Sequence, residues 1–81
     1  MSLANQAAPE PFSVSKPSLL GLTRAGLAEA LRAIGTPERE IRMRVAQLWH
    51  WIYFQGARDF DAMLNVSKVM RQKLGEHYSL A

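Results

Sequence analysis

Arginine side chains are concentrated in the middle of the sequence, where they could bind phosphate groups. Residues 21–58 hold six arginines against three glutamates, whereas residues 1–20 and 59–81 each carry no net charge. A guanidinium group can place two parallel hydrogen bonds on a phosphate, so a polyanionic partner is one interpretation of this excess. A solvated basic face without a partner is the other interpretation that charge alone allows.

A run of aromatic residues follows these arginines in the segment QLWHWIYFQG, residues 47–56. Five rings, counting the imidazole of His50, lie within the six positions 49–54. Unpaired bases stack on such rings where the rings are exposed beside cations. On a helical wheel Trp49 and Trp51 flank the apolar stripe and are expected in the core, whereas His50 and Phe54 lie on the far side. The His50 side could therefore meet a nucleic acid, another domain or only water.

The residue types give little support to other chemistries. The chain has no cysteine, so it cannot by itself form a thiolate zinc site or hold an iron–sulfur cluster. Neither histidine has a carboxylate three or four residues further on, and no metal site is expected. There is no glycine-rich phosphate loop, and Ser67, His77 and Asp61 lack the local signature of nucleophilic catalysis. The chain alone is expected to be non-catalytic.

Length and composition bound the fold. The 81 residues, 48% of them hydrophobic, suffice for one small globular domain. No apolar run approaches the ~18 residues of a membrane span, and the first residues do not have the pattern of a signal peptide. We therefore expect a cytoplasmic location without membrane contact, in agreement with the lack of disulfides.

A disordered tail over residues 1–18 and a helical domain over residues 19–81 are expected. Three of the four prolines lie in this tail, which has no helical apolar stripe. Phe12 and Val14 could still pack onto the domain.

The first helix is expected to begin after Thr23, its N-cap, and to end at Gly35 in a left-handed conformation. Its apolar stripe has helical spacing and comprises Leu27, Ala30, Leu31 and Ile34.

A second helix is expected to have Thr36 as its cap, Pro37 as its first residue and Gly56 at its end. Its core stripe comprises Ile41, Val45, Leu48 and Ile52. The periodicity leaves open whether this helix is continuous or broken near Arg42–Arg44.

The last part of the chain contains two further cap signals. Asp59 is expected to cap a short turn through Phe60–Met63, and Ser67 to cap the last helix. The stripe of that helix comprises Val66, Val69, Met70 and Leu74, with Lys68, Arg71 and Gln72 facing away. No segment alternates with period two, so no strand is expected. The predicted fold is all-α, a small bundle of three main helices plus a short helical turn.

Four residues of the second helix form an R-x-x-Q-x-x-x-W-x-Y pattern: Arg44, Gln47, Trp51 and Tyr53. They are followed by Phe60, Met63, the N-x-S-K of Asn65–Lys68, Arg71 and Leu74. Over about residues 19–78 this order resembles the N-terminal accessory domain of RlmN/Cfr-type radical SAM RNA methyltransferases.

The resemblance implies a small module, similar to a helix-hairpin-helix fold, that presents structured RNA to a later catalytic barrel. Enzymes of that family methylate C2 of an adenine in 23S ribosomal RNA and in certain tRNAs, using S-adenosylmethionine and a [4Fe–4S] cluster. The cluster motif C-x-x-x-C-x-x-C is absent from this chain. The chain would thus be a monomeric part of a longer enzyme, with RNA and the barrel as partners and no cofactor of its own. The resemblance also implies that the second helix starts afresh near Arg44, with residues 37–41 as a separate turn.

Six residues are the candidates for RNA contacts: Arg39, Arg42, Arg44, His50, Lys68 and Arg71. Arg44 and Arg71 could instead be structural. Lys68 is unfavourable to the dipole of the helix that it begins, which suggests an external partner. A generic helical nucleic-acid module and a protein-docking domain are the alternatives to the methyltransferase domain.

Overall fold

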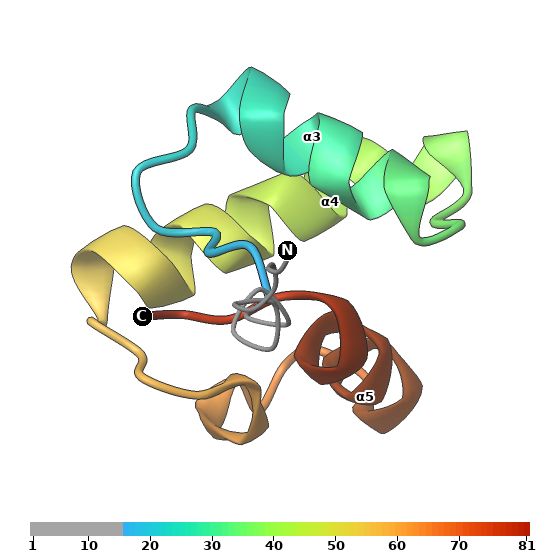
Figure 1. Ribbon diagram of the computed structural model, residues 1–81. Coiled ribbons are helices and arrows are strands. Elements are labelled where there is room, and N and C mark those ends of the chain that lie inside the picture. Colours follow the sequence, from blue (N-terminus) through green and yellow to red (C-terminus); the bar gives the residue numbers. More distant parts are fainter. Residues whose placement is uncertain (1–15) are drawn as a thin grey trace, which may run out of the picture.

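The computed structural model describes residues 16–81. The predicted disorder of residues 1–15 and the suggested packing of Phe12 and Val14 lie outside the described residues. The elements are α3 (Arg24–Ala33), α4 (Glu38–Trp49), η1 (His50–Phe54), η2 (Phe60–Ala62) and α5 (Lys68–His77). α3 and α4 run side by side in opposite directions, and α5 lies below them in Figure 1. Residues 16–81 contain no strand, which confirms the predicted all-α fold with three main helices.

The turn between α3 and α4 explains a wrong prediction for Thr36. α3 begins as predicted, because the Thr23 hydroxyl accepts a hydrogen bond from the Gly26 N–H at 3.0 Å. It ends in a Schellman motif, in which Gly35 has a φ of 89° and the Thr36 N–H donates to the Leu31 carbonyl. α4 then begins one residue later than predicted, with Pro37 as its N-cap and no side-chain cap. Thr36 itself is buried, and its hydroxyl finds no partner within the described residues.

α4 is continuous through Arg42 and Arg44, which corrects the break that the family resemblance implied. The irregular segment begins six residues after Arg44, in η1. There the Gln55 N–H donates to the carbonyl of His50, five residues back, so η1 is a π-turn. Gly56, with a φ of 62°, ends the helix as predicted. The predicted stripe of Ile41, Val45, Leu48 and Ile52 is buried.

The two predicted caps in the C-terminal part are confirmed, but one flank of α5 is not as predicted. Asp59 Oδ1 accepts from the Ala62 N–H at 3.0 Å, and Ser67 Oγ accepts from the Met70 N–H at 3.2 Å. Val69, predicted in the stripe, is 67% exposed. Arg71, predicted to face away, is half-buried and donates to the Asp61 carbonyl at 2.9 Å. α5 is therefore rotated so that its Arg71 flank meets η2.

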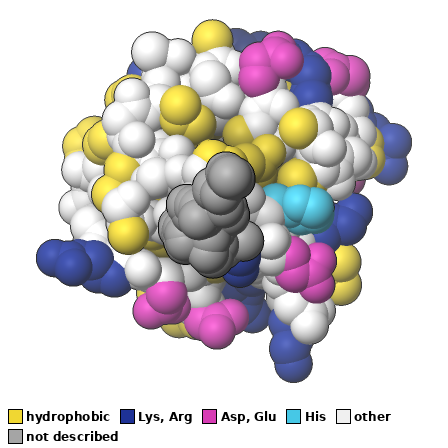
Figure 2. Space-filling view, viewed as in Figure 1, with side chains coloured by type: hydrophobic (Ala, Val, Ile, Leu, Met, Phe, Trp, Pro, Cys, Tyr) yellow, Lys and Arg dark blue, Asp and Glu magenta, His cyan; other side chains and the backbone are white. Residues whose placement is uncertain are grey.

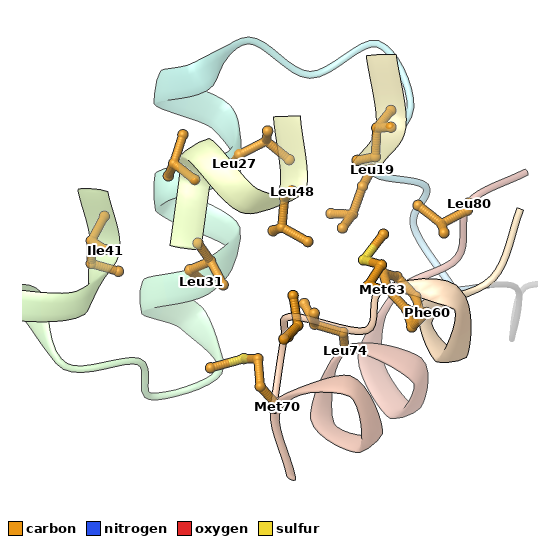
Figure 3. Packing of buried hydrophobic residues seen from close by; sticks show 13 residues of the cluster. Leu19, Leu27, Leu31, Ile41, Leu48, Phe60, Met63, Met70, Leu74 and Leu80 are labelled. Carbon is orange, nitrogen blue, oxygen red and sulfur yellow. The ribbon is translucent and has the colours of Figure 1, made fainter. Parts of the chain in front are cut away.

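All the helical elements contribute to one hydrophobic core (Figure 3). Its members are Leu19, Leu27, Leu31, Ile41, Val45, Leu48, Ile52, Phe60, Met63, Val66, Met70, Leu74 and Leu80. Leu19 and Leu80 come from segments that pair at the two ends of the described chain: the Leu19 N–H donates to the Ser79 carbonyl, and the Ser79 N–H to the Pro17 carbonyl. Residues 17 and 18 thus already join the domain, just before the expected boundary at residue 19.

Candidate nucleic-acid interface

Two arginines of α4 present free guanidinium groups on one face of the helix. Arg39 and Arg42 are both exposed. They are three residues apart, so their side chains project on neighbouring parts of the same helical surface. Neither forms a hydrogen bond or an ion pair with any of residues 16–81. Their charges are available to an external anion.

A shallow groove runs between α3 and α4, and Arg42 stands on its rim. The groove has a volume of about 550 Å³ and is lined by Arg24, Ala25, Ala28, Arg32, Glu38, Ile41, Arg42, Val45 and Ala46. Small and apolar side chains form its floor, and charged residues border it.

Arg24 is a basic residue of this groove that sequence reasoning missed. Its guanidinium carbon lies 4.1 Å from the ring centroid of Trp49, in cation–π geometry. Arg24 is the first residue of α3, where a positive charge is unfavourable to the helix dipole. This position could have indicated Arg24 from the sequence, because Lys68 is likewise a cation at the start of a helix.

Arg32, the third arginine of the groove, is neutralised by two carboxylates. Its guanidinium donates to Glu38 at 2.5 Å and to Glu29 at 2.8 Å. The hydrogen bond to Glu38 raises the pKa of Arg32 and lowers the pKa of Glu38. The net positive charge at the groove therefore comes from Arg24 and Arg42.

Arg44 belongs to an internal network instead of the exposed basic face. Its guanidinium donates to the Gln47 side chain at 3.0 Å and to Glu40 at 3.3 Å. The Gln47 amide then donates to the carbonyl of Asn65 at 3.1 Å, and the Trp51 indole N–H donates to Asn65 Oδ1 at 2.7 Å. This chain of bonds fastens the loop before α5 onto α4 and η1.

Tyr53, the last member of the R-x-x-Q-x-x-x-W-x-Y pattern, fastens another segment. Its hydroxyl accepts from the Gly21 N–H at 2.8 Å and donates to the Leu22 carbonyl at 3.1 Å. Arg71 likewise bonds within the domain, to Asp61. Gln47, Trp51 and Tyr53 of the pattern thus hold two loops in place, and Arg44 supports Gln47.

His50 and Lys68, the remaining candidates, lie apart from the arginine pair. His50 is exposed and stacks on Phe54, with ring centroids 5.8 Å apart and an angle of 23° between the rings. Its Nε2 also lies 3.2 Å from the Gln55 amide nitrogen. Lys68 is exposed at the start of α5. Among the contacts of residues 16–81, Arg39 and Arg42 are the two neighbouring candidates that have no bonded partner.

Two further properties of residues 16–81 bear on partners and cofactors. None of the helices in this part of the chain has the length and apolar character that crossing a membrane requires. Nor do three histidine or carboxylate side chains of the described residues come close enough to hold a metal ion.

Comparison with known proteins extends the resemblance seen in the sequence. Residues 17–80 match the family described as the ribosomal RNA large subunit methyltransferase N-terminal domain. The chain belongs to this family. A relative from Beijerinckia indica, named dual-specificity RNA methyltransferase RlmN, is 64% identical over 73 residues. A relative of the same name from Methylocella silvestris is 69% identical over 64 residues.

The matches cover most of this chain but a small part of each relative. They include 90% of the chain and 19% of the Beijerinckia protein, and 79% of the chain and 16% of the Methylocella protein. The chain thus spans less than a fifth of the length of these family members. No solved structure matches it.

Proposed function

We propose that this chain is the RNA-recruiting N-terminal domain of a longer cytoplasmic enzyme that methylates C2 of adenine in 23S ribosomal RNA and tRNA. Family membership and the name that the relatives carry support this role. The enzyme would act as a monomer and use S-adenosylmethionine and one [4Fe–4S] cluster. This chain has no cysteine and does not fit such a cluster, so the cofactors belong to the part of the polypeptide outside it.

The observation that carries the RNA-binding role is the free arginine pair of α4. Arg39 and Arg42 are exposed and unpaired within the described residues, on a helix that is anchored in the core by Ile41 and Val45. Phosphate contacts from such a rigid element position an RNA without reading its sequence. Arg24, across the groove from Arg42, adds a third cation that the backbone of the same RNA could reach.

The other candidates are assigned by their contacts. The contacts of Arg44 and Arg71 support a structural role, because their guanidinium groups already donate to groups of the domain. Lys68, at the start of α5, would make a second phosphate contact that is separate from the arginine pair. His50 lies on the aromatic side of the molecule, away from the arginine pair along α4.

A salt titration tests the proposal. The 81-residue chain is titrated with a structured tRNA, or with a stem from ribosomal RNA, at two salt concentrations. Two to three phosphate contacts predict that the logarithm of the affinity falls by roughly 2 to 3 per tenfold increase in salt, since each contact contributes about 0.9. An affinity that is indifferent to salt, or no binding at low salt, would contradict the proposal.

A further inference from the structure

Apolar side chains reach the surface at one end of the molecule, around η1 and the segment before α3. Phe54 is 74% exposed, Leu20 43% and Tyr53 42%. The bonds from the Tyr53 hydroxyl to Gly21 and Leu22 hold these two segments together. We call Leu20, Tyr53 and Phe54 the apolar end surface. In the space-filling view, hydrophobic side chains emerge on the left, over the position that η1 occupies in Figure 1 (Figure 2).

A hollow of about 380 Å³ adjoins the apolar end surface and shares Leu20 with it. Its other walls are Ile52, residues 56–58 and the C-terminal Leu80 and Ala81. Figure 1 shows the C-terminal end of the chain beside η1. The family is an N-terminal domain, and the chain spans less than a fifth of its relatives. The family match ends at residue 80, so in such a relative the polypeptide after the domain continues from this hollow, beside the apolar end surface.

Two polar side chains at this surface are already bonded within the domain. The Tyr53 hydroxyl both accepts and donates a hydrogen bond, and the His50 ring pairs with Gln55. Arg58 is the one cation that borders the hollow. Arg42 lies twelve residues before Phe54, which is roughly 18 Å along the helix axis. The chemistry of this end thus favours an apolar protein surface over a phosphate backbone.

We propose that the apolar end surface docks onto an apolar face of the polypeptide that follows this domain in the full-length enzyme. Exposed apolar patches of this kind mark interaction sites. Docking there would fix the arginines of α4 relative to the catalytic part of the enzyme. The proposal rests on the part of the proposed function that makes this chain the N-terminal domain of a longer polypeptide, and it does not depend on RNA binding.

Hydroxyl-radical footprinting tests the docking, because it measures how far each side chain is exposed to solvent. The 81-residue chain is compared with a full-length chimera, in which this chain replaces the matching segment of the Beijerinckia indica relative. Oxidation of Phe54 and Tyr53 should be several-fold slower in the chimera. Leu64, which is 78% exposed and lies outside the surface, is the internal control and should not change.

Two outcomes of this comparison overturn the proposal. In the first, Phe54 is oxidised at the same rate in the chain and in the chimera. In the second, Phe54 becomes protected only when structured RNA is added, which would assign the surface to nucleic acid. The salt titration of the isolated chain is independent of both results, so failure of docking and failure of RNA binding are distinguishable.

A matched pair of variants separates docking from folding. Phe54→Ser in the chimera should raise the oxidation of Tyr53 to its rate in the isolated chain, whereas Leu64→Ser should not. Both side chains are exposed, so thermal unfolding of the isolated chain should be the same for both variants. Leu20→Ser is a second route to the same loss of protection. Tyr53 that stays protected in both Phe54→Ser and Leu20→Ser would overturn the proposal.

Discussion

The indole N–H of Trp51 donates to Oδ1 of Asn65 at 2.7 Å, and this bond joins η1 to the loop before α5. Gln47, one helical turn earlier, donates to the backbone carbonyl of the same asparagine. Two residues of the family pattern therefore converge on a third. This convergence gives Gln47, Trp51 and Asn65 a shared structural contact within the domain.

Replacing Trp51 by Phe removes the donor to Asn65 and keeps one six-membered aromatic ring against the core. The loss of one hydrogen bond should lower the free energy of unfolding by about 1 kcal/mol, measured by urea denaturation. Phe54→Leu is the control, since Phe54 is 74% exposed, and it should change stability by less than about 0.5 kcal/mol. Equal stability of the Trp51 variant and the wild-type chain would show that the bond does not hold the loop.

Tyr53→Phe removes a hydroxyl that makes two backbone hydrogen bonds. Two such bonds predict a loss of about 1–3 kcal/mol in the free energy of unfolding. The Gly21 amide, which donates to this hydroxyl at 2.8 Å, should also exchange its hydrogen faster. Hydrogen exchange followed by NMR checks this locally, and an unchanged Gly21 rate would contradict the role given to Tyr53.

Arg44→Gln should destabilise the chain without changing how it binds RNA. The Arg44 side chain is 15% exposed, and its loss leaves Glu40 and Gln47 without their partner. Removing hydrogen bonds to a charged group predicts a cost of about 1–3 kcal/mol in urea denaturation. Under conditions where the variant is fully folded, its RNA affinity should equal that of the wild-type chain. Weaker RNA binding by a fully folded Arg44→Gln variant would contradict this prediction and would indicate that Arg44 contacts RNA.

The stability at high pH should depend on Tyr78. Its hydroxyl donates to the Ala30 carbonyl at 2.8 Å, and burial raises the pKa of Tyr78 in the folded state. A raised folded pKa stabilises the fold below the unfolded pKa, about 10, and this contribution is lost as the pH rises through the folded value. The free energy of unfolding should therefore fall above about pH 10 in the wild-type chain. Tyr78→Phe, compared over the same pH range, should show a smaller fall, and an identical pH dependence would contradict this assignment.

The local parts of the fold were predictable because their causes are local. Thr23, Asp59 and Ser67 each cap a helix through an N–H three residues further on, which sequence alone can indicate. Thr36 is likewise of a residue type that caps helices, but it lies in the C-terminal turn of α3, and α4 begins after Pro37.

The remaining features depend on partners that are distant in sequence. α5 has only two buried side chains, Met70 and Leu74, so its sequence does not decide which flank packs on η2. Val69 was therefore predicted to be buried and is exposed, whereas Arg71 was predicted to be exposed and is half-buried. The bonds from α4 and η1 to Asn65 likewise join segments whose contact no periodicity reveals. At the candidate site, the sequence predicted Arg39, Arg42 and Arg44 alike as RNA contacts. Only the structure distinguishes Arg44, because its guanidinium is hydrogen-bonded to Gln47 and Glu40.

The central claim, that the arginine pair of α4 contacts RNA, is tested most directly by two charge-matched double variants. Arg39→Gln/Arg42→Gln removes the pair, and Arg58→Gln/Lys73→Gln removes two exposed charges elsewhere. Each variant is titrated with the same structured tRNA over a range of salt concentrations. The first variant should bind more weakly, and its salt dependence should be smaller by roughly 1.8, because each lost phosphate contact removes about 0.9. The second should keep the wild-type salt dependence, and equal changes in the two variants would contradict the claim.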